Sequence, residues 1–313
     1  MKFLQWQKRW LEIYKQPRVK HHTYLIYKSV LEIHINPHFE QMEIEEIGAD
    51  TIYDFLYQKL KSGNKKNGCK MTAASVNLMR AIIKSIFEDA LKAGLVKSNP
   101  CTLVKRFSGK EREMRVFTKR EQSELERRCL REGDSLHIGI LIALYTGLRI
   151  GELLALKWGD VDLRSKLFRI QRTKYCAKDT DGQWRNLYDT PKSKSSKRDI
   201  PIAPSLINIL SREKARATGE FVIINEKGES PNIRNYQHFF AKMQINIVKN
   251  PLNFHALRHT FATRAVEAGV DIKTLSELMG HKDATLTLNR YSHSLLDTKK
   301  KAMCRLELYM SAK

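Results

Sequence analysis

A short charged segment divides this chain into two regions of different pattern. Residues 106–115 read RFSGKEREMR, with a Ser-Gly pair, many charged side chains and little to bury. Such a composition favours a linker. At 313 residues the chain is long enough for two domains that each bury a core. We therefore predict a first domain over residues 1–106, a linker over 107–117 and a second domain over 118–313.

The balance of charge indicates a polyanionic partner. The chain has 56 Lys and Arg against 34 Asp and Glu, a formal net charge of +22, which exceeds what solubility alone requires. The basic residues are spread along the whole chain, and no apolar run approaches the roughly 20 residues that span a bilayer. Nucleic acid therefore fits better than a membrane.

The cysteines and the N-terminal residues indicate the cellular compartment of the protein. The five cysteines are odd in number and widely spaced, without a Cys-x-x-Cys pair: Cys69, Cys101, Cys129, Cys176 and Cys304. They suggest reduced thiols rather than a disulfide framework or a zinc knuckle. The opening MKFLQWQKRWLEIYK lacks the apolar core and cleavage site of a secretory signal. We expect a cytoplasmic protein.

The first region carries a helical pattern that is clearest between Thr72 and Gly94. Thr72 can cap the start of this helix, and Gly94 can close its end. Its apolar side chains recur every three to four residues, at Val76, Met79, Ile83, Ile86 and Ala90.

The opposite face of the same helix carries Asn77, Arg80 and Lys84, one turn apart. In so basic a chain we predict that this stripe contacts DNA phosphates. A merely solvated face is the alternative.

The second region is predicted to be mixed. Thr118 and Glu121 have the spacing of a capping box, which starts a helix. Leu167–Thr173 alternates large apolar and polar side chains, and Asp199–Ile202 is a further short strand, with the basic stretch 192–198 before it. These patterns predict a mainly α chain with a small antiparallel sheet of two or three strands in its second domain.

Residues 146–152, TGLRIGE, are the first segment with the marks of a site. Two glycines interrupt an apolar pattern and place one arginine, Arg149, at the junction. A structural turn in which Arg149 merely pairs with Glu152 is the alternative.

Residues 253–261, NFHALRHTF, form the second such segment. His255 and Arg258 are three residues apart on a helix and point into the same space. His259 follows His255 by four, which invites a zinc interpretation, but the zinc motif needs a glutamate where Ala256 stands. We predict no metal site.

The third segment, Leu278–His281, reads LMGH. Gly280 fits the C-cap of an amphipathic helix and leaves His281 just past its end. Ten residues later Tyr291 follows within RYSH. An isolated tyrosine is more often half-buried in a core than a nucleophile, so only its combination with the other segments gives it weight.

Together TGLRIGE, HALRHTFAT, LMGH and RYSH resemble the four motif blocks of the tyrosine recombinase, or phage integrase, family, in the same order. Residues 1–106 resemble the family's helical, SAM-like core-binding domain, and residues 118–313 its mixed α+β catalytic domain. Because the chain begins close to the core-binding helices, the extra arm-binding module of many such integrases is not expected.

The resemblance implies the roles of five residues. Arg149 and Arg258 would grip the scissile phosphate, with His255 and His281 beside them and Tyr291 as the nucleophile. Negative charge develops on the phosphate oxygens during displacement, and guanidiniums offer planar, bidentate and permanent positive charge for it. His255 would take the phenol proton, because a tyrosine titrates near 10.

The resemblance also implies a lysine, in a turn between two strands, that protonates the departing 5′ oxygen. Lys192 fits best, Lys194 is the second choice and a candidate for DNA binding, and Lys174 is a distant third. Glu152 would support His255 or Arg149 from behind. Because the phosphotyrosine retains the energy of the cut bond, no metal, ATP or other cofactor is expected.

The partners follow from the same resemblance. They are double-stranded DNA at specific recombination sites, a homotetramer on two such sites and an accessory directionality factor, without a membrane. Integration or excision of a phage or other mobile element is the expected role. A DNA-relaxing enzyme of the type IB topoisomerase group and a catalytically silent DNA-binding regulator are the alternatives.

Overall fold

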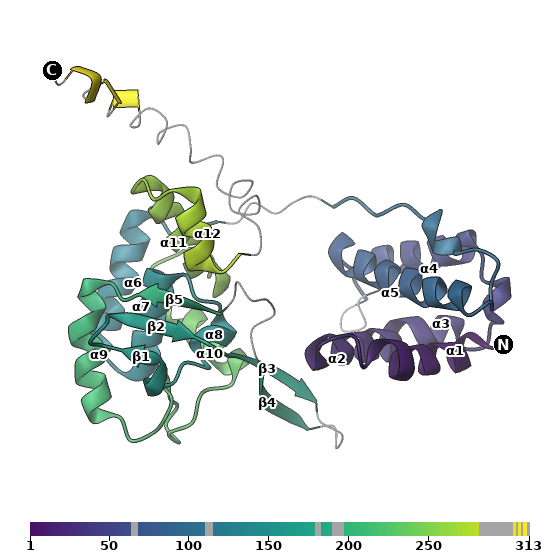
Figure 1. Cartoon of the computed structure of the whole chain (residues 1–313), viewed down its shortest axis with the longest axis horizontal. Helices are drawn as coiled ribbons and strands as arrows, with labels where there is room; N and C mark the ends of the chain where they lie inside the picture. The colour runs from purple at the N-terminus through teal and green to yellow at the C-terminus, as the bar shows by residue number, and fades with distance from the viewer. Residues whose placement is uncertain are drawn as a thin grey trace. The chain divides into compact units, whose positions relative to one another are not determined.

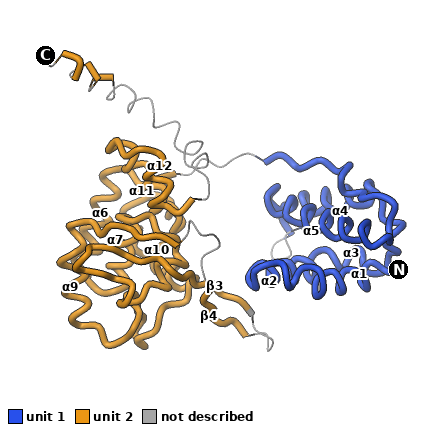
Figure 2. The backbone as a smooth tube through the Cα atoms, in the orientation of Figure 1, with its two compact units in different colours: residues 1–112 blue, residues 113–313 orange. Residues whose placement is uncertain are grey.

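The structure is a computed structural model that describes residues 1–63, 68–109, 115–178, 183–189, 197–281, 303–304, 306–307 and 309–311. The chain divides into two compact units, residues 1–112 and 113–313 (Figure 2). The division falls inside the segment 107–117 that the sequence predicts as a linker. In the described part of the chain, no helix is both long and apolar enough to cross a membrane.

The first unit is helical (Figure 1). Its elements are α1 (Phe3–Arg9), η1 (Trp10–Lys15), α2 (His21–Val30), η2 (Leu31–Ile35), α3 (Asn36–Phe39), η3 (Ile44–Glu46), α4 (Ala49–Ser62), α5 (Ala73–Lys92) and η4 (Pro100–Thr102). Two tryptophans tie its first helical segments to α5. The indole N–H of Trp6 donates to the Ile86 carbonyl over 3.2 Å, and that of Trp10 donates to Asp89 Oδ2 over 3.0 Å.

Helix α5 confirms the predicted helix between Thr72 and Gly94. The Thr72 hydroxyl accepts a hydrogen bond from the Ser75 N–H over 3.2 Å, which caps the helix start. Gly94 follows the helix with a φ of +74°. All five predicted core positions are buried: Val76, Met79, Ile83, Ile86 and Ala90.

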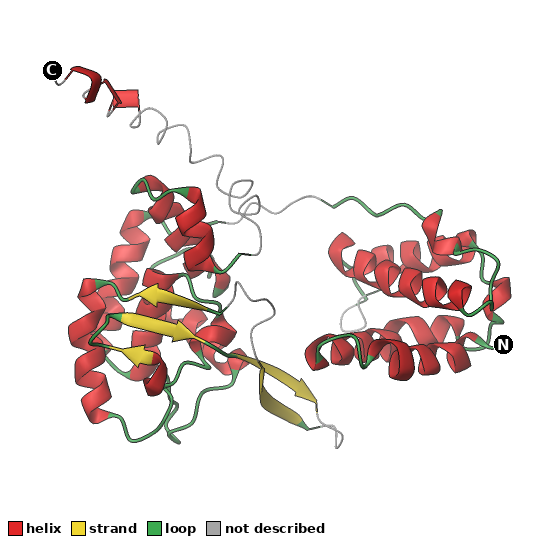
Figure 3. Ribbon diagram, viewed as in Figure 1, coloured by secondary structure: helices red, strands yellow, loops and turns green. Residues whose placement is uncertain are grey.

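The described residues of the second unit form helices and two small sheets (Figure 3). Its helices are α6 (Lys119–Glu132), α7 (Ser135–Thr146), α8 (Ile150–Leu153), η5 (Trp158–Asp160), α9 (Pro204–Arg216), α10 (Ile233–Met243), α11 (His255–Glu267) and α12 (Ile272–Met279). The predicted capping box is confirmed at the start of α6. The Glu121 N–H donates to the Thr118 hydroxyl over 3.2 Å, and the Thr118 N–H donates to Glu121 Oε2 over 2.9 Å.

One antiparallel sheet has the strand order β1-β2-β5, formed by β1 (Val161–Asp162), β2 (Leu167–Ile170) and β5 (Arg198–Pro201). Strand β5 confirms the predicted strand at 199–202 to within one residue. The other sheet is a hairpin of β3 (Thr173–Lys178) and β4 (Trp184–Asp189) that extends beyond the helices of the unit (Figure 3).

The prediction of one strand over Leu167–Thr173 is wrong in one respect. The pairing of β2 with β5 ends at Ile170, opposite Arg198, and Thr173 already pairs with Asp189 in the hairpin. The predicted pattern covers β2 and only the first residue of β3, and it does not show where the pairing partner changes. Strand β4 was not predicted, because most of its residues are exposed and it lacks an apolar face.

Candidate active site

Arg149 stands directly before α8, after a tight turn at Gly147. Gly147 ends α7 with a φ of +64°, and a Cβ there would lie 2.6 Å from the Phe261 ring, so this position requires glycine. The Arg149 backbone N–H donates to Glu152 Oε2 over 3.1 Å, and its Nη1 donates to Glu152 Oε1 over 2.7 Å. Glu152 thus holds both the backbone and the side chain of Arg149.

Arg258 lies one turn into α11, and its side chain is almost entirely buried at 2% exposure. Its Nη1 donates to the Gly147 carbonyl over 2.7 Å, and its Nη2 donates to the Met279 carbonyl over 2.6 Å. A buried guanidinium must be paired or hydrogen-bonded. Here it connects the end of α7 with the end of α12.

The end of α12 confirms the predicted cap. Gly280 has a φ of +63°, and the N–H of His281 donates to the Ser276 carbonyl over 3.0 Å, as in a Schellman motif. Nη2 of Arg149 donates to the Gly280 carbonyl over 3.0 Å. Arg149 and Arg258 therefore converge on neighbouring carbonyls, immediately before His281.

His255 is the first residue of α11 and is exposed, one turn before the buried Arg258. Its ring contacts that of His259 edge-on, with 4.7 Å between the centroids. His259 is itself buried, and α12 lies beside α11 (Figure 1). The structure thus gathers Arg149, Arg258 and His281 at one end of these helices and leaves His255 accessible from outside.

Arg198, the first residue of β5, joins this cluster although the sequence did not single it out. Its Nη2 and Nη1 donate to Glu152 Oε2 and Oε1 over 3.0 and 3.3 Å, and its Nε donates to the Leu278 carbonyl over 2.7 Å. Its side chain is only 7% exposed. Its sole sequence signal was its place at the junction of the basic stretch and the predicted strand.

Glu152 is buried between two arginines. Burial by itself favours the neutral carboxyl, but the guanidinium of Arg198 and then that of Arg149 hold the pKa of Glu152 below its ordinary value. Glu152 is therefore an anion at neutral pH, with both oxygens hydrogen-bonded. The pairing of Arg149 with Glu152, which was the alternative to a catalytic role on the sequence alone, is present. It is part of a network that also includes Arg198.

Three predicted site residues, Lys192, Lys194 and Tyr291, lie outside the described residues. Arg198 follows the stretch with the two lysines, and His281 is the last described residue before the stretch with Tyr291. The described cluster therefore includes the second described residue after one stretch, Arg198, and the last described residue before the other, His281.

Lys174, the third choice for the catalytic lysine, is instead held inside the unit. Its side chain is 2% exposed, and its Nζ donates to the Ser230 carbonyl, the Ser230 hydroxyl and the Pro231 carbonyl over 2.9, 2.8 and 2.8 Å. All three ammonium protons are used by the chain itself. Lys174 is a structural residue that fastens β3 to the loop before α10.

This burial predicts a pH dependence of stability. Burial lowers the pKa of Lys174 from 10.5 to about 8. The charged form is thus penalised in the folded state below about pH 8, and the penalty disappears as the pH rises toward 10.5. Relative to Lys174→Met, the wild type should gain on the order of 3 kcal/mol in free energy of unfolding across that range. Urea denaturation at pH 7.5, 9 and 10.5 measures this.

Lys227, exposed on the same loop as Ser230, provides the control. The stability difference between wild type and Lys227→Met should stay nearly constant with pH. A difference that is equally constant for Lys174→Met would contradict the prediction.

The predicted DNA-binding stripe on α5 has internal partners. The Asn77 amide group donates to the Phe107 carbonyl and accepts from its N–H over 2.8 and 3.0 Å. Nε of Arg80 donates to the Val104 carbonyl over 2.6 Å. Nζ of Lys84 lies 3.6 Å from Oε1 of Glu88. Asn77 and Arg80 thus attach the segment after η4 to α5. The sequence had suggested either phosphate contact or a solvated face, and neither included this structural role. Phosphate contact by the stripe stays a prediction.

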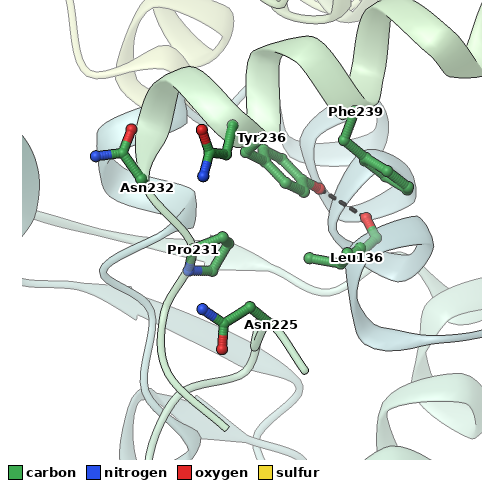
Figure 4. A pocket seen from close by; sticks show the side chains of 7 residues that line it. Leu136, Asn225, Pro231, Asn232, Tyr236 and Phe239 are labelled. Atoms are coloured by element: carbon green, nitrogen blue, oxygen red, sulfur yellow. Dashed lines mark hydrogen bonds between the residues drawn. The ribbon is translucent and has the colours of Figure 1, made fainter. Parts of the chain in front are cut away.

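A pocket of about 130 Å³ lies elsewhere in the second unit (Figure 4). Its lining consists of Leu136, Asn225, Pro231, Asn232, Asn235, Tyr236 and Phe239. The Tyr236 hydroxyl donates to the Leu136 carbonyl over 2.7 Å. The pocket contains none of the residues discussed above as catalytic, so the candidate site is the arginine cluster.

Known proteins with solved structures share this fold. The Tn1549 transposon integrase, solved in complex with transposon right end DNA, matches 98% of this chain and 100% of its own with a TM-score of 0.79 and 22% identity. A lambda integrase tetramer bound to a Holliday junction matches 90% of this chain and 77% of its own with a TM-score of 0.65 and 20% identity. This likeness shows that the chain shares the fold of these two integrases.

Sequence comparison identifies the family. A tyrosine recombinase XerC-like protein of Caldanaerobacter subterraneus subsp. tengcongensis is 32% identical over 284 residues, which are 83% of this chain and 70% of that protein. The ICEBs1 integrase of Bacillus subtilis is 27% identical over 88% of this chain and 74% of its own. The phage integrase family model matches residues 109–297, and the model of the phage integrase N-terminal SAM-like domain matches residues 2–60. This chain therefore belongs to the phage integrase family of tyrosine recombinases.

Proposed function

We propose that this chain is a site-specific recombinase that cleaves and rejoins DNA strands through a 3′-phosphotyrosine on Tyr291. The observation that carries the proposal is the convergence of Arg149 and Arg258 on the neighbouring carbonyls of Gly280 and Met279, next to His281. Two permanent cations gathered at one helix end suit an anion that gains charge during reaction.

The arginines act as a preorganised clamp for the scissile phosphate. Arg149 is held by Glu152 and Gly280 yet keeps 37% of its side chain exposed. Arg258 is held more deeply, by Gly147 and Met279. Because both guanidiniums are already oriented, little reorganisation is needed when charge develops on the phosphate oxygens.

The cleavage step uses the remaining predicted residues. The phenol oxygen of Tyr291 attacks phosphorus while His255 takes its proton, and the P–O5′ bond breaks as Lys192, or Lys194, protonates the departing 5′ oxygen. His281 donates a hydrogen bond to the phosphate. A 5′ hydroxyl from a partner strand then gives its proton to Lys192, or Lys194, and attacks phosphorus. The bond between Tyr291 and phosphorus breaks as His255 returns a proton to the phenol oxygen. The bond energy is conserved and the arginines supply the positive charge, so neither ATP nor a metal takes part.

The proposed partner is double-stranded DNA at specific recombination sites, bound by a homotetramer on two sites. The net charge of +22 supports a DNA partner, and the structural relatives include integrases bound to transposon-end DNA and to a Holliday junction. Integration or excision of a mobile element is the proposed role, in line with the ICEBs1 integrase and the prophage phiRv2 integrase among the sequence relatives. An accessory directionality factor is a further proposed partner.

The test is covalent capture on a suicide substrate, a duplex from the end of the element nicked close to the crossover point. Wild type should form an adduct that survives a denaturing gel in the presence of EDTA and the absence of ATP. Tyr291→Phe should bind the same duplex without forming any adduct, because it lacks the attacking oxygen.

Tyr309→Phe is the matched control, since Tyr309 lies outside the motif blocks and is 82% exposed. It should form the adduct at the wild-type rate. An adduct that persists in Tyr291→Phe would refute this choice of nucleophile. Binding by wild type without any adduct would instead favour the DNA-binding regulator, and relaxation of supercoiled DNA lacking the element's sites would favour a topoisomerase.

A further inference from the structure

We infer that Arg198 is a positioning residue for strand cleavage, which fixes Glu152 and the end of α12 and, through them, Arg149 and His281. The inference rests on the proposed function. We assign Arg198 no contact with the DNA phosphate, because its Nη1 and Nη2 both donate to the Glu152 carboxylate and its Nε donates to the Leu278 carbonyl. Its role would be to hold the groups that do.

The first support is a row of three arginines at one helix end. The successive carbonyls of Leu278, Met279 and Gly280 accept hydrogen bonds from Arg198, Arg258 and Arg149, over 2.7, 2.6 and 3.0 Å. The last carbonyls of a helix lack intrahelical partners and carry partial negative charge. Arg198 thus completes a set that also contains both proposed phosphate-binding arginines.

The second support is the geometry around Glu152. Oε1 accepts from Nη1 of Arg149 and Nη1 of Arg198, and Oε2 accepts from the Arg149 backbone N–H and Nη2 of Arg198. A carboxylate has about four lone-pair sites, and these four N–H groups occupy them. Arg198 supplies half of the contacts that orient the carboxylate, and Glu152 in turn orients Arg149.

The third support is the close approach of Arg198 to Gly280. A Cβ at Gly280 would lie 2.8 Å from Nη1 and 3.0 Å from Cζ of Arg198. Position 280 therefore requires glycine for two reasons: its backbone is left-handed, and a side chain there would clash with the Arg198 guanidinium. The helix end that leads to His281 lies directly against Arg198, so a smaller side chain there would leave that end unsupported.

The charges in this cluster predict a distinctive pH effect. Among the described residues, the charged groups that face Glu152 are Arg149, from its own turn, and Arg198, from β5. Without Arg198, only Arg149 would offset the burial that raises the pKa of Glu152. Glu152 would then take up a proton at higher pH and lose an acceptor site for Arg149.

The experiment compares Arg198→Met and Arg198→Lys with wild type in single-turnover cleavage of the nicked suicide duplex, from pH 5 to 9. Arg198→Met should slow cleavage at saturating DNA by about 10- to 100-fold, while the Kd for the duplex changes less than about threefold. The acid limb of its rate profile should move to higher pH. Arg198→Lys should recover part of the rate and keep an acid limb close to that of wild type, because the charge remains.

Arg264→Met is the matched control. Arg264 also joins a carboxylate to a backbone carbonyl, donating to Glu267 over 2.9 Å and to the Phe117 carbonyl over 2.7 Å, but it lies near the other end of α11. Its loss should leave the rate and the acid limb nearly unchanged. In a Glu152→Gln background, the shift of the acid limb caused by Arg198→Met should vanish, because the titrating group is gone.

Other outcomes are decisive in different ways. Equal slowing in Arg198→Met and Arg264→Met, or slowing without a shift of the acid limb, would overturn the positioning role and leave a structural one. If Arg198→Met does not fold, Arg198→Lys decides the matter. An ammonium cannot make the several hydrogen bonds of the planar guanidinium, so a folded Arg198→Lys that cleaves at the wild-type rate would overturn the inference. Failure of wild type to form any adduct would instead refute the proposed function.

Discussion

Arg258→Met is expected to reduce strand cleavage by about 10³-fold or more, with DNA binding retained. Loss of a single donor to a developing anion costs about 10²- to 10³-fold, and Arg258 is proposed to offer a bidentate guanidinium. The variant also leaves the carbonyls of Gly147 and Met279 without this donor, which should cost about 1–3 kcal/mol for each buried group. Single-turnover cleavage and urea denaturation measure the two effects separately.

Arg258→Lys separates charge from geometry. Its ammonium keeps the positive charge but lacks the planar fork that reaches Gly147 and Met279 together. We expect cleavage roughly 10²-fold slower than wild type, with Arg264→Met on the same helix near the wild-type rate. Cleavage by Arg258→Met within tenfold of wild type would contradict a phosphate-binding role for this residue.

Glu152→Ala is expected to lower the free energy of unfolding of the second unit by about 3–5 kcal/mol, as when one partner of a buried ion pair is removed. Glu152 is 3% exposed and Arg198 7%, so the substitution leaves a buried guanidinium without its anion. Glu152→Gln should cost less, because its amide oxygen still accepts from an arginine. Urea denaturation at pH 7 measures both.

Glu220→Ala is the control for Glu152→Ala. Oε2 of Glu220 also lies 2.7 Å from a cation, Nζ of Lys157, but 60% of the Glu220 side chain is exposed. Removal of this carboxylate should therefore lower the free energy of unfolding by only about 0–1 kcal/mol. Because the pKa of Glu152 is lowered, the stability it contributes is present above its ordinary value of 4.5 and is lost as the pH falls through the folded pKa. Equal losses for Glu152→Ala and Glu220→Ala would show that the buried network contributes little.

Local signals in the sequence were enough for several elements. The cap at Thr72, the box of Thr118 with Glu121 and the left-handed Gly280 each depend on residues within one helical turn, so their patterns can be read directly. The order of the motif blocks was also sufficient to identify the family. The matches of family models to residues 2–60 and 109–297 confirm this identification.

The sequence by itself thus determined the helix after Thr72, the caps at Thr118 and Gly280 and the membership of the family, while the tertiary structure decided how the site is held together. Arg149 meets Gly280 across 131 residues, Arg258 meets Gly147 across 111, and Arg198 meets Leu278 across 80. Such contacts leave no periodic trace, so the place of Arg198 at the junction of the basic stretch and the predicted strand did not reveal its partners. The burial of Lys174 depends in the same way on a loop 56 residues away. Periodicity and caps report on interactions within a few turns of chain, whereas these buried charges are stabilised by carbonyls and carboxylates that only folding brings to them.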